Sequence, residues 1–321
     1  MTQNDNKYSM EKLPFVSVIV PNYNYAQYLP ERMESIFNQT YQNYEVIILD
    51  DHSTDNSLEI IEKYQSYPRV SKILINDINS GSPFIQWEQG IKEASGDVIW
   101  IAESDDTCSR CFLETLVSLY VLTESVLTFC HSELIDERGE KLRDNQQMKN
   151  VTSDLSMDGK EFIRNYLAYS NEIQNASCAI FSKEAALGID KEYMNYKGAG
   201  DWLFWINIAE QGNVSYSSSI CNNYRLHCNT TSKVIKSGLE FYEMKSIYDR
   251  LLKNGYLNRL QFERCKQDNL YLILSLNEIP FRVKMELFRM WNVSLIHFFL
   301  LRMKMRICRI LFPIRRAFVL K

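Results

Sequence analysis

Three carboxylates stand within four positions at the end of an apolar run in the segment WIAESDD, residues 100 to 106: Glu103, Asp105 and Asp106. Carboxylates this close repel one another and raise one another's pKa unless a cation lies among them. Mg²⁺ and Mn²⁺ prefer such oxygen ligands, and an ion held by one or two carboxylates completes its shell with water and substrate phosphates. The segment therefore predicts either a divalent metal site or, more simply, aspartates that cap a helix starting at SRCFLE.

A second acidic cluster lies in DDHSTDNS, residues 50 to 57, where Asp50 and Asp51 follow another apolar run. A carboxylate in such a place can accept the N–H of a base such as uracil or the hydroxyls of a ribose. Tyr23, two residues past Pro21, follows a third apolar run. Its ring could stack on a base, which is worth roughly 1–3 kcal/mol. These residues favour a nucleotide as the phosphorylated ligand.

Glycine-rich phosphate loops do not occur in the sequence, which contains neither G-x-G-x-x-G nor G-x-x-x-x-G-K-[ST]. A Rossmann dehydrogenase or a P-loop kinase is therefore disfavoured. The phosphates of a nucleotide need another counter-charge, and a metal ion at Asp105 and Asp106 would supply it.

The first hundred residues alternate between two hydrophobic periods. Short β-branched runs typical of buried strands lie at residues 15–20, 44–50, 71–76 and 97–102, and apolar residues at helical spacing lie at 26–40, 57–67 and 83–95. This alternation predicts an α/β fold with a mostly parallel, mixed sheet and helices on both faces. Ligands bind beyond the carboxyl ends of such strands, so both acidic clusters should lie along one edge.

The rest of the chain changes from mixed to helical structure. We expect a helix at residues 110–124, a strand at 125–136, an exposed loop at 137–154, a strand entering a helix at 175–189, a helix at 200–212 and a strand at 213–227. From about residue 238 the pattern is helical to the end. The length of 321 residues fits one large domain with an appendage, or two domains.

Cysteine usage and the N-terminus predict a protein that stays in the cytoplasm. The eight cysteines show no zinc-ribbon pairing, and Cys108-x-x-Cys111 has the spacing of half a zinc site without a second half nearby. We interpret them as reduced thiols. The N-terminal residues 1–15 are polar and lack the apolar stretch of a secretory signal.

Charge is distributed unevenly. The formal net charge is −4, from 36 basic and 40 acidic residues, but eight Lys and Arg and no Asp or Glu follow Glu286, so residues 1 to 286 carry −12. The longest uncharged run in this tail, Met290 to Leu301, is shorter than the about 20 residues needed to cross a bilayer. We predict an in-plane amphipathic helix on an anionic membrane, with Arg302, Arg306 and Arg309 near one face. The alternative is packing on the protein or in a homodimer interface.

The segments VSVIVPNYNYAQYLPERMESIFNQTYQNYEVIILDDHSTDNS and NSGSPFIQWEQGIKEASGDVIWIAESDD resemble the nucleotide-sugar half of the family 2 glycosyltransferases of the GT-A fold. The resemblance is dense over residues 15 to 107 and looser to about residue 232. Two positions depart from the family pattern: IQWEQ precedes Gly90 where many relatives have Ala-Arg-Asn, and Glu103 replaces the first acid of D-S-D-D.

The resemblance implies a role for each matching residue. Pro21 and Tyr23 would line the base pocket, with Asp51 and Asp50 facing the base. Asp105 would contact the ribose or the metal ion. Asp106 would bind the Mn²⁺ or Mg²⁺ that bridges the diphosphate.

Two later motifs extend the resemblance. Asp201, in Gly200-Asp201-Trp202, would be the general base that deprotonates the acceptor hydroxyl, although a carboxylate there could equally be a helix N-cap. In YRLHCNTTS, His227 would be a further metal ligand, since neutral imidazole suits Mn²⁺, and Arg225 would neutralise the leaving phosphates. A lone histidine can also be purely structural.

The sequence thus predicts an inverting, metal-dependent glycosyltransferase that moves a sugar from a nucleoside-diphosphate donor, expected to be a UDP-sugar, to a glycan or lipid-linked glycan in surface polysaccharide synthesis. Residues 1–235 would form the GT-A domain, with a nucleotide-sugar half at 15–107 and an acceptor half at 108–235. Residues 236–321 would form a helical region that docks at the inner face of the cell membrane, and no nucleic acid is expected as a partner. The alternatives are a non-catalytic nucleotide-sugar or glycan-binding module and a nucleotidyltransferase.

Overall fold

The computed structural model describes residues 13–143, 145–227, 237–294, 296, 298–300 and 303. Its internal contacts divide the chain into two compact units. The first unit combines Met1–Met157, Asn175–Ile189 and Gln211–Arg225, and the second combines Asp158–Gln174, Asp190–Glu210 and Leu226–Lys321. The domain boundaries expected at residues 107 and 235 remain predictions, and each unit is described by itself below.

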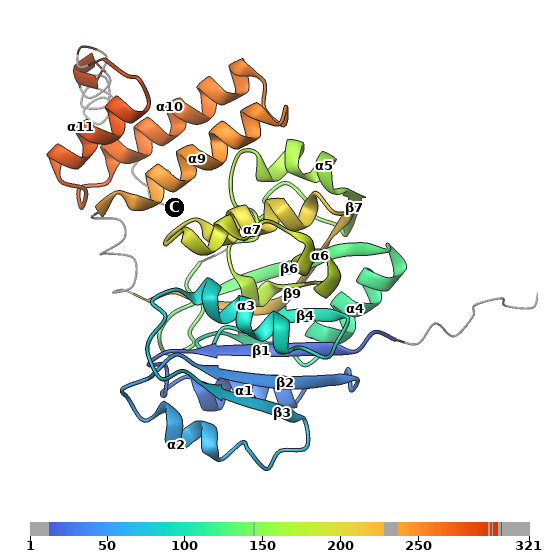
Figure 1. Cartoon of the computed structure of the whole chain (residues 1–321). Coiled ribbons are helices and arrows are strands. Elements are labelled where there is room, and N and C mark those ends of the chain that lie inside the picture. The colour runs from blue at the N-terminus through green and yellow to red at the C-terminus, as the bar shows by residue number, and fades with distance from the viewer. Residues whose placement is uncertain are drawn as a thin grey trace, which may run out of the picture. The chain divides into compact units, whose positions relative to one another are not determined.

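The first unit is built on a mixed sheet, which in the described residues has nine strands in the order β3-β2-β1-β4-β8-β6-β9-β5, with β7 paired to β9. Strands β1 to β4 run parallel, β8 is antiparallel to both β4 and β6, and β6 is parallel to β9 (Figure 1). The predicted α/β class with a mixed sheet is confirmed. The strands are β1 (Val16–Asn22), β2 (Tyr44–Asp50), β3 (Val70–Ile75), β4 (Val98–Ile101), β5 (Thr107–Cys108), β6 (Ser125–Ile135), β7 (Leu155–Asp158), β8 (Ala179–Ser182) and β9 (Asn213–Arg225).

Register along the central strands brings the acidic segments to one edge. Strands β1, β2 and β4 are buried along their whole length, as their apolar runs predict. Asn22 pairs with Asp50 at the carboxyl ends of β1 and β2. Ile19 of β1 pairs with Ile101, the last residue of β4, so the exit of β4 begins beside the same end of the sheet.

Helices cover both faces of the parallel strands, with α3 in front of them and α1 behind them in Figure 1. Gly90 allows the close approach of α3, because a Cβ there would come within 2.4 Å of Ile19 Cγ2. The helix expected at 26–40 starts only at Leu29, where a proline occupies the first turn and needs no backbone donor. The helices described in this unit are α1 (Leu29–Phe37), α2 (Ser57–Glu62), α3 (Pro83–Glu93), α4 (Phe112–Leu122), a 3₁₀ helix (Ala176–Cys178) and α6 (Lys183–Gly188).

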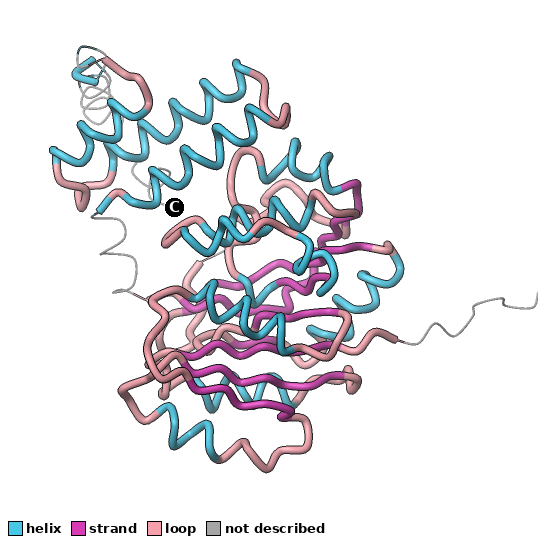
Figure 2. Tube along the Cα trace, viewed as in Figure 1, coloured by secondary structure: helices cyan, strands magenta, loops and turns pink. Residues whose placement is uncertain are grey.

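The second unit is helical, as expected for the chain beyond residue 238 (Figure 2). The side chain of Trp291 packs against Tyr248 and Phe262, which joins the last helices through aromatic contacts. None of the helices in the described ranges is long and apolar enough to span a membrane. Among the described residues, the helices of this unit are α5 (Gly159–Phe162), a π-helix (Ile163–Leu167), a 3₁₀ helix (Lys191–Asn195), α7 (Gly200–Ala209), α9 (Leu239–Lys253), α10 (Arg259–Ser275) and α11 (Phe281–Met290), and residues 296, 298–300 and 303 are also helical.

Candidate active site

The exit of β4 holds its carboxylates by long-range contacts. Asp106 is 1% exposed, and its Oδ1 accepts from the backbone N–H of Arg225 at 2.9 Å while Oδ2 accepts from Asn175 Nδ2 at 2.6 Å. Glu103 Oε1 accepts from Trp87 Nε1 at 2.9 Å. Helix α4 begins at Phe112 without a side-chain cap. The alternative that Asp105 and Asp106 serve as helix caps is therefore wrong.

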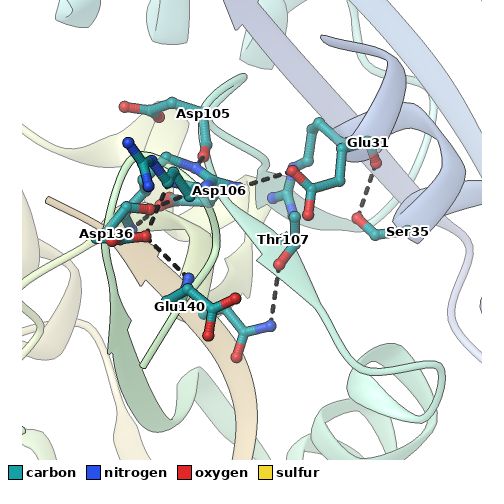
Figure 3. Close-up of polar contacts among 11 residues, drawn as sticks. Glu31, Ser35, Asp105, Asp106, Thr107, Asp136 and Glu140 are labelled. Carbon is teal, nitrogen blue, oxygen red and sulfur yellow. Dashed lines mark hydrogen bonds and ion pairs between the residues drawn. The ribbon is translucent and has the colours of Figure 1, made fainter. Parts of the chain in front are cut away.

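Two buried cations lie beside these acids in the described ranges, and Arg225 is the first. Its Nε donates to Asp105 O at 2.6 Å, Nη1 to Asp136 O at 3.0 Å and Nη2 to Glu31 Oε2 at 2.8 Å, and its guanidinium lies 4.7 Å from the ring centre of Tyr28. Figure 3 shows the acidic residues Glu31, Asp105, Asp106 and Asp136 gathered at this place. Because the side chain is only 1% exposed, these contacts favour a structural role for Arg225. The expected contact with the leaving phosphates remains a prediction.

Arg32 of α1 is the second cation. It is fully buried, its guanidinium lies 4.8 Å from the ring centre of Trp100, and none of its three side-chain nitrogens has a hydrogen-bond partner in the described part of the chain. Its charge attracts Glu103 and Asp106 and opposes the rise in the pKa of each. Part of the positive charge that the acidic segment requires is thus supplied by the protein itself.

The arginines compensate the acids at the exit of β4 only in part. Burial raises the pKa of Glu103 to about 8 and that of Asp106 to about 6, and the charge of Asp105 adds to both shifts. Burial also raises the pKa of Tyr25, whose hydroxyl hydrogen-bonds to Asp105. Hard oxygen donors whose ionised forms repel one another fit a divalent cation, which would stabilise those forms.

Few protein side chains are placed to bind a divalent ion at the exit of β4 in the described part of the chain. In the ranges that the structure describes, no three His, Cys, Asp or Glu side chains come together as a ready-made metal site. The exit of β4 therefore fits an ion that takes one or two carboxylates and completes its shell with phosphate oxygens and water, as Mg²⁺ commonly does.

The exit of β2 contrasts with that of β4. Asp50 Oδ2 accepts from Asn22 Nδ2 and Ser53 Oγ, both at 2.7 Å, and Asp50 Oδ1 accepts from Ser53 N at 2.8 Å. Asp51 accepts from Asn76 Nδ2 at 2.7 Å, from Ser80 N at 2.9 Å and from Ser80 Oγ at 2.8 Å. Burial alone would raise the pKa of Asp51, but these hydrogen bonds outweigh it and hold the pKa below its ordinary value.

The exit of β1 adds an exposed ring to this edge. Pro21 is buried within β1, and Tyr23 is 45% exposed, as a surface that stacks on a base requires. Asn24 Oδ1 accepts from Thr54 N at 2.7 Å, and Ala26 N donates to Asp55 Oδ2 at 3.0 Å. These bonds join the β1 and β2 loops, so Tyr23 and Asp51 lie on connected segments.

Asp201 lies in the first turn of α7 in the second unit. The N-cap of α7 is Ala199, so Asp201 is inside the helix and does not cap it. Its Oδ2 accepts from Asn171 Nδ2 at 2.8 Å. Burial raises the pKa of Asp201 to about 7, and the charge of Glu240 adds to the rise while the bond from Asn171 opposes it. A carboxylate with this pKa can exchange a proton with a substrate near neutral pH.

The other predicted residues lie in the second unit, in the loop after β6 or outside the described residues. His227 is half-buried in the second unit, two residues beyond Arg225, and its assignment as a metal ligand stays a prediction. The expected loop at 137–154 contains a turn in which Leu142 N bonds to Leu134 O at 2.9 Å. Residues 228–236, with Thr231 of the YRLHCNTTS motif, and most of the basic tail, with Arg302, Arg306 and Arg309, lie outside the described residues.

Sequence reasoning missed several residues that shape the site. Arg32 appeared only as one position in an amphipathic helix, and Asn175 and Asn171 lie in segments without a recognisable motif. The only signal that could have drawn attention to Arg32 is a charge next to Met33, on the apolar side of α1, since both side chains are buried.

Known proteins resemble the chain over most of its length. An uncharacterised glycosyltransferase of Haemophilus influenzae is 30% identical over 70% of this chain and 69% of its own length. The putative teichuronic acid biosynthesis glycosyltransferase TuaG of Bacillus subtilis is 24% identical over 68% of this chain and 82% of its own length.

Solved structures share the fold. TarS 1-349 of S. aureus, in complex with UDP, has a TM-score of 0.59 at 18% identity and covers 91% of both chains. The mannosyltransferase PcManGT of Pyrobaculum calidifontis, in complex with GDP-Man and Mn²⁺, has a TM-score of 0.58 at 17% identity and covers 95% of this chain and 83% of its own. These similarities confirm the GT-A type of fold.

The family model described as glycosyl transferase family 2 matches residues 17–188, more than half of the chain. This range contains the exits of β1, β2 and β4, where the carboxylates and Tyr23 lie. The chain belongs to glycosyltransferase family 2 and is a glycosyltransferase.

Proposed function

We propose that the protein is an inverting glycosyltransferase that moves a sugar from a nucleoside-diphosphate donor, a UDP-sugar, to a glycan or lipid-linked glycan in surface polysaccharide synthesis. The observation that carries this proposal is the cluster of Glu103, Asp105 and Asp106 at the exit of β4, where burial and the charge of Asp105 raise the pKa of the other two acids, beside loops that present Tyr23 and Asp51. The UDP complex of TarS supports the donor base, and the assignment of TuaG to teichuronic acid biosynthesis supports the class of product.

The donor would bind across the strand ends of the first unit. Tyr23 would stack on the base next to Pro21, and Asp51, which hydrogen bonds keep ionised, would accept an N–H from the base or a hydroxyl from the ribose. Asp50 would act by fixing the same loop through Asn22 and Ser53. Asp105 is partly exposed and would contact the ribose or the metal ion.

A divalent cation, Mn²⁺ or Mg²⁺, would bind at Asp106, with Asp105 beside it. When bound, such an ion stabilises the negative charge that develops on the departing diphosphate. The Mn²⁺ in the PcManGT complex supports this part of the proposal. His227 as a further ligand is a proposal from the sequence, and replacing it with alanine should weaken the response to Mn²⁺ if it is correct.

Proton transfer would be the task of Asp201. The acceptor hydroxyl gives its proton to the ionised carboxylate, and its oxygen attacks the anomeric carbon from the face opposite the diphosphate. The bond between the anomeric carbon and the diphosphate oxygen breaks as the new bond forms, so the anomeric configuration inverts. The pKa of about 7 leaves a substantial fraction of Asp201 ionised at neutral pH.

Thermal stabilisation by a panel of nucleotides tests this function. UDP or a UDP-sugar with Mn²⁺ should raise the Tm by several degrees, because a ligand that binds only the folded state stabilises it. Nucleotide without metal should shift the Tm less, and a Tyr23→Ala variant should lose most of the shift. A Tm that responds to no nucleoside diphosphate would refute the donor. Nucleotide binding without any transfer to acceptors would instead favour the non-catalytic binding module.

A stripe of exposed apolar side chains supports the proposal that the C-terminal region docks on the inner face of the cell membrane. Ile296 is 75% exposed, Phe299 54%, Leu300 53% and Met303 55%, a spacing that places all four on one face of a helix. Phe298, on the other face, is buried against Phe288. Apolar side chains on one face, followed by basic residues and no acids, suit an anionic membrane surface.

Vesicle co-sedimentation tests the docking. The full chain should bind vesicles that contain phosphatidylglycerol more tightly than vesicles of phosphatidylcholine alone, and Phe299→Asp with Leu300→Asp should weaken binding at least tenfold. Leu260→Asp is the matched control, because Leu260 is 73% exposed on α10, away from the stripe in sequence. Equal binding by both variants would refute the membrane surface, and loss of a dimer in the double variant would assign the stripe to the homodimer.

A further inference from the structure

The turn before α7 donates three consecutive backbone N–H groups to one carboxylate of α9. Glu243 Oε1 accepts from Lys197 N at 2.6 Å, and its Oε2 accepts from Gly198 N and Ala199 N, both at 2.8 Å. Charge-assisted bonds of this kind are about twice as strong as neutral ones. Because Glu243 is only 8% exposed, this contact fixes the backbone immediately before Asp201 with little competition from water.

The segment that carries Asn171 is attached to the same pair of helices. Tyr248 of α9 donates its hydroxyl to Tyr169 O at 2.9 Å, and Gln261 of α10 donates Nε2 to the Tyr169 hydroxyl at 2.7 Å. Two residues further along, Asn171 Nδ2 holds Asp201 Oδ2. Helices α9 and α10 thus support the aspartate in two ways, through the backbone that precedes it and through the segment that carries Asn171.

We propose that Glu243 and Asn171 are positioning residues for Asp201, so that α9 and α10, which lie outside the family match at residues 17–188, form the support of the catalytic base. The proposal rests on the proposed function, in which Asp201 takes the proton of the acceptor. Asn171 supplies a donor that favours the ionised carboxylate, and Glu243 fixes where the carboxylate points. A displacement of about 1 Å at such a group is sufficient to lower a rate about 100-fold.

Two side chains near Asp201 shift its pKa in opposite directions. Glu240, in the first turn of α9, is the ionisable side chain that raises the pKa of Asp201, while Asn171 lowers it. The two groups therefore predict opposite changes in pH dependence when they are neutralised or removed. A residue that served only to hold the fold together would change stability without such a signed shift.

Steady-state kinetics of the full-length protein test the proposal. Glu243→Gln keeps the shape of the side chain but places an amide N–H₂ against backbone donors, and it should lower kcat at least tenfold while the KM for the donor sugar changes less than twofold. Asn171→Ala should move the acid limb of the kcat profile to higher pH by about half a unit or more. Glu240→Gln should move it to lower pH.

A control and an independent measurement keep the outcome interpretable. Asp249→Asn removes a surface ion pair with Lys245 on the same helix and should leave kcat and the pH profile unchanged. If Glu243→Gln lowers the Tm too far for kinetics, hydrogen exchange at residues 197–199 in the folded protein should still be at least tenfold faster in Glu243→Asp.

One result would refute the positioning roles of Glu243 and Asn171, and another would refute Asp201 as the base. Wild-type kcat and an unshifted pH profile in both Glu243→Gln and Asn171→Ala, with Asp201→Asn inactive, would refute the positioning roles and leave the proposed function intact. Transfer activity that survives in Asp201→Asn would refute the assignment of the base itself.

Discussion

Strands β2 and β4 both end in neighbouring carboxylates at one edge of the sheet, yet the protein surrounds the two groups differently. At the exit of β2, backbone N–H groups and side chains donate to every carboxylate oxygen of Asp50 and Asp51. At the exit of β4, burial and mutual repulsion raise the pKa of Glu103 and Asp106 despite two nearby arginines. Hydrogen bonds outweigh burial at Asp51 and lower its pKa, whereas at Asp106 they do not outweigh burial and the charge of Asp105, so a bound cation would stabilise the ionised form of Asp106.

Asp201 resembles the β4 exit in its electrostatics, because burial raises its pKa to about 7. The acids therefore form two groups: Asp51 stabilises the fold when ionised, whereas Glu103, Asp106 and Asp201 destabilise it when ionised. Perturbed acids of the second kind concentrate at functional sites.

Asp201→Asn should give the largest effect on activity. Loss of the general base should lower kcat by about 10²–10⁴-fold. The Tm at pH 8 should not fall, because the wild-type protein must keep a buried carboxylate ionised there. Initial rates and thermal unfolding at pH 8 measure both effects, and a variant that keeps more than a tenth of the rate would remove Asp201 from the catalytic role.

Asp106→Asn should come next, with a loss of transfer activity of about 100-fold. The change removes the charge proposed to hold the divalent ion, so the rise in Tm caused by Mn²⁺ with nucleotide should largely disappear. Titration of Mn²⁺ against the Tm provides the measurement. An unchanged Mn²⁺ response would contradict the assignment of Asp106 as a ligand.

Asp50→Asn should mainly lower stability, whereas Asp106→Asn should mainly lower activity. An amide in place of this carboxylate turns a donor toward Asn22 or Ser53, which should lower the free energy of unfolding by about 1–3 kcal/mol. Activity of the folded fraction should fall less than in Asp106→Asn. Urea denaturation compared with initial rates separates the two effects, and a stable but inactive variant would mean that Asp50 contacts the substrate.

The pH dependence of stability should give the smallest effect and should differ in sign between the two strand ends. The raised pKa values of Glu103, Asp106 and Asp201 contribute stability that is fully present below about pH 4 and is lost as the pH rises through about 6 to 8. The lowered pKa of Asp51 contributes stability that is present above its ordinary pKa and lost in acid.

Unfolding measured from pH 8 to pH 5.5 without metal should therefore show an increase in stability of about 1–2 kcal/mol. Saturating Mn²⁺ with nucleotide should reduce the part of this increase that comes from the exit of β4. A stability that declines steadily from pH 8 to pH 5.5 would show that the raised acids do not carry the assigned charges.

Much of the fold could be predicted from the sequence because strands and helices leave local periodic signals. The run at residues 44–50 became β2 with the predicted bounds, and the predicted strand and helix at 175–189 became β8 and α6. The position of the acids followed as well, since parallel strands bring their carboxyl ends to one edge. The boundaries of α1 and α2 were less accurate, because their flanking residues form turns that the apolar spacing does not show.

What the sequence by itself determined is which residues stand at the strand ends and which chemistry their types allow. Only the tertiary structure decided which acids are neutralised. Arg225 reaches Asp106 across 119 positions and Glu31 across 194, because the parallel pairing of β6 with β9 places Arg225 opposite Ile135. Such partnerships depend on how distant elements pack, and the charge state of a buried carboxylate depends on its partners far more than on its neighbours in the sequence.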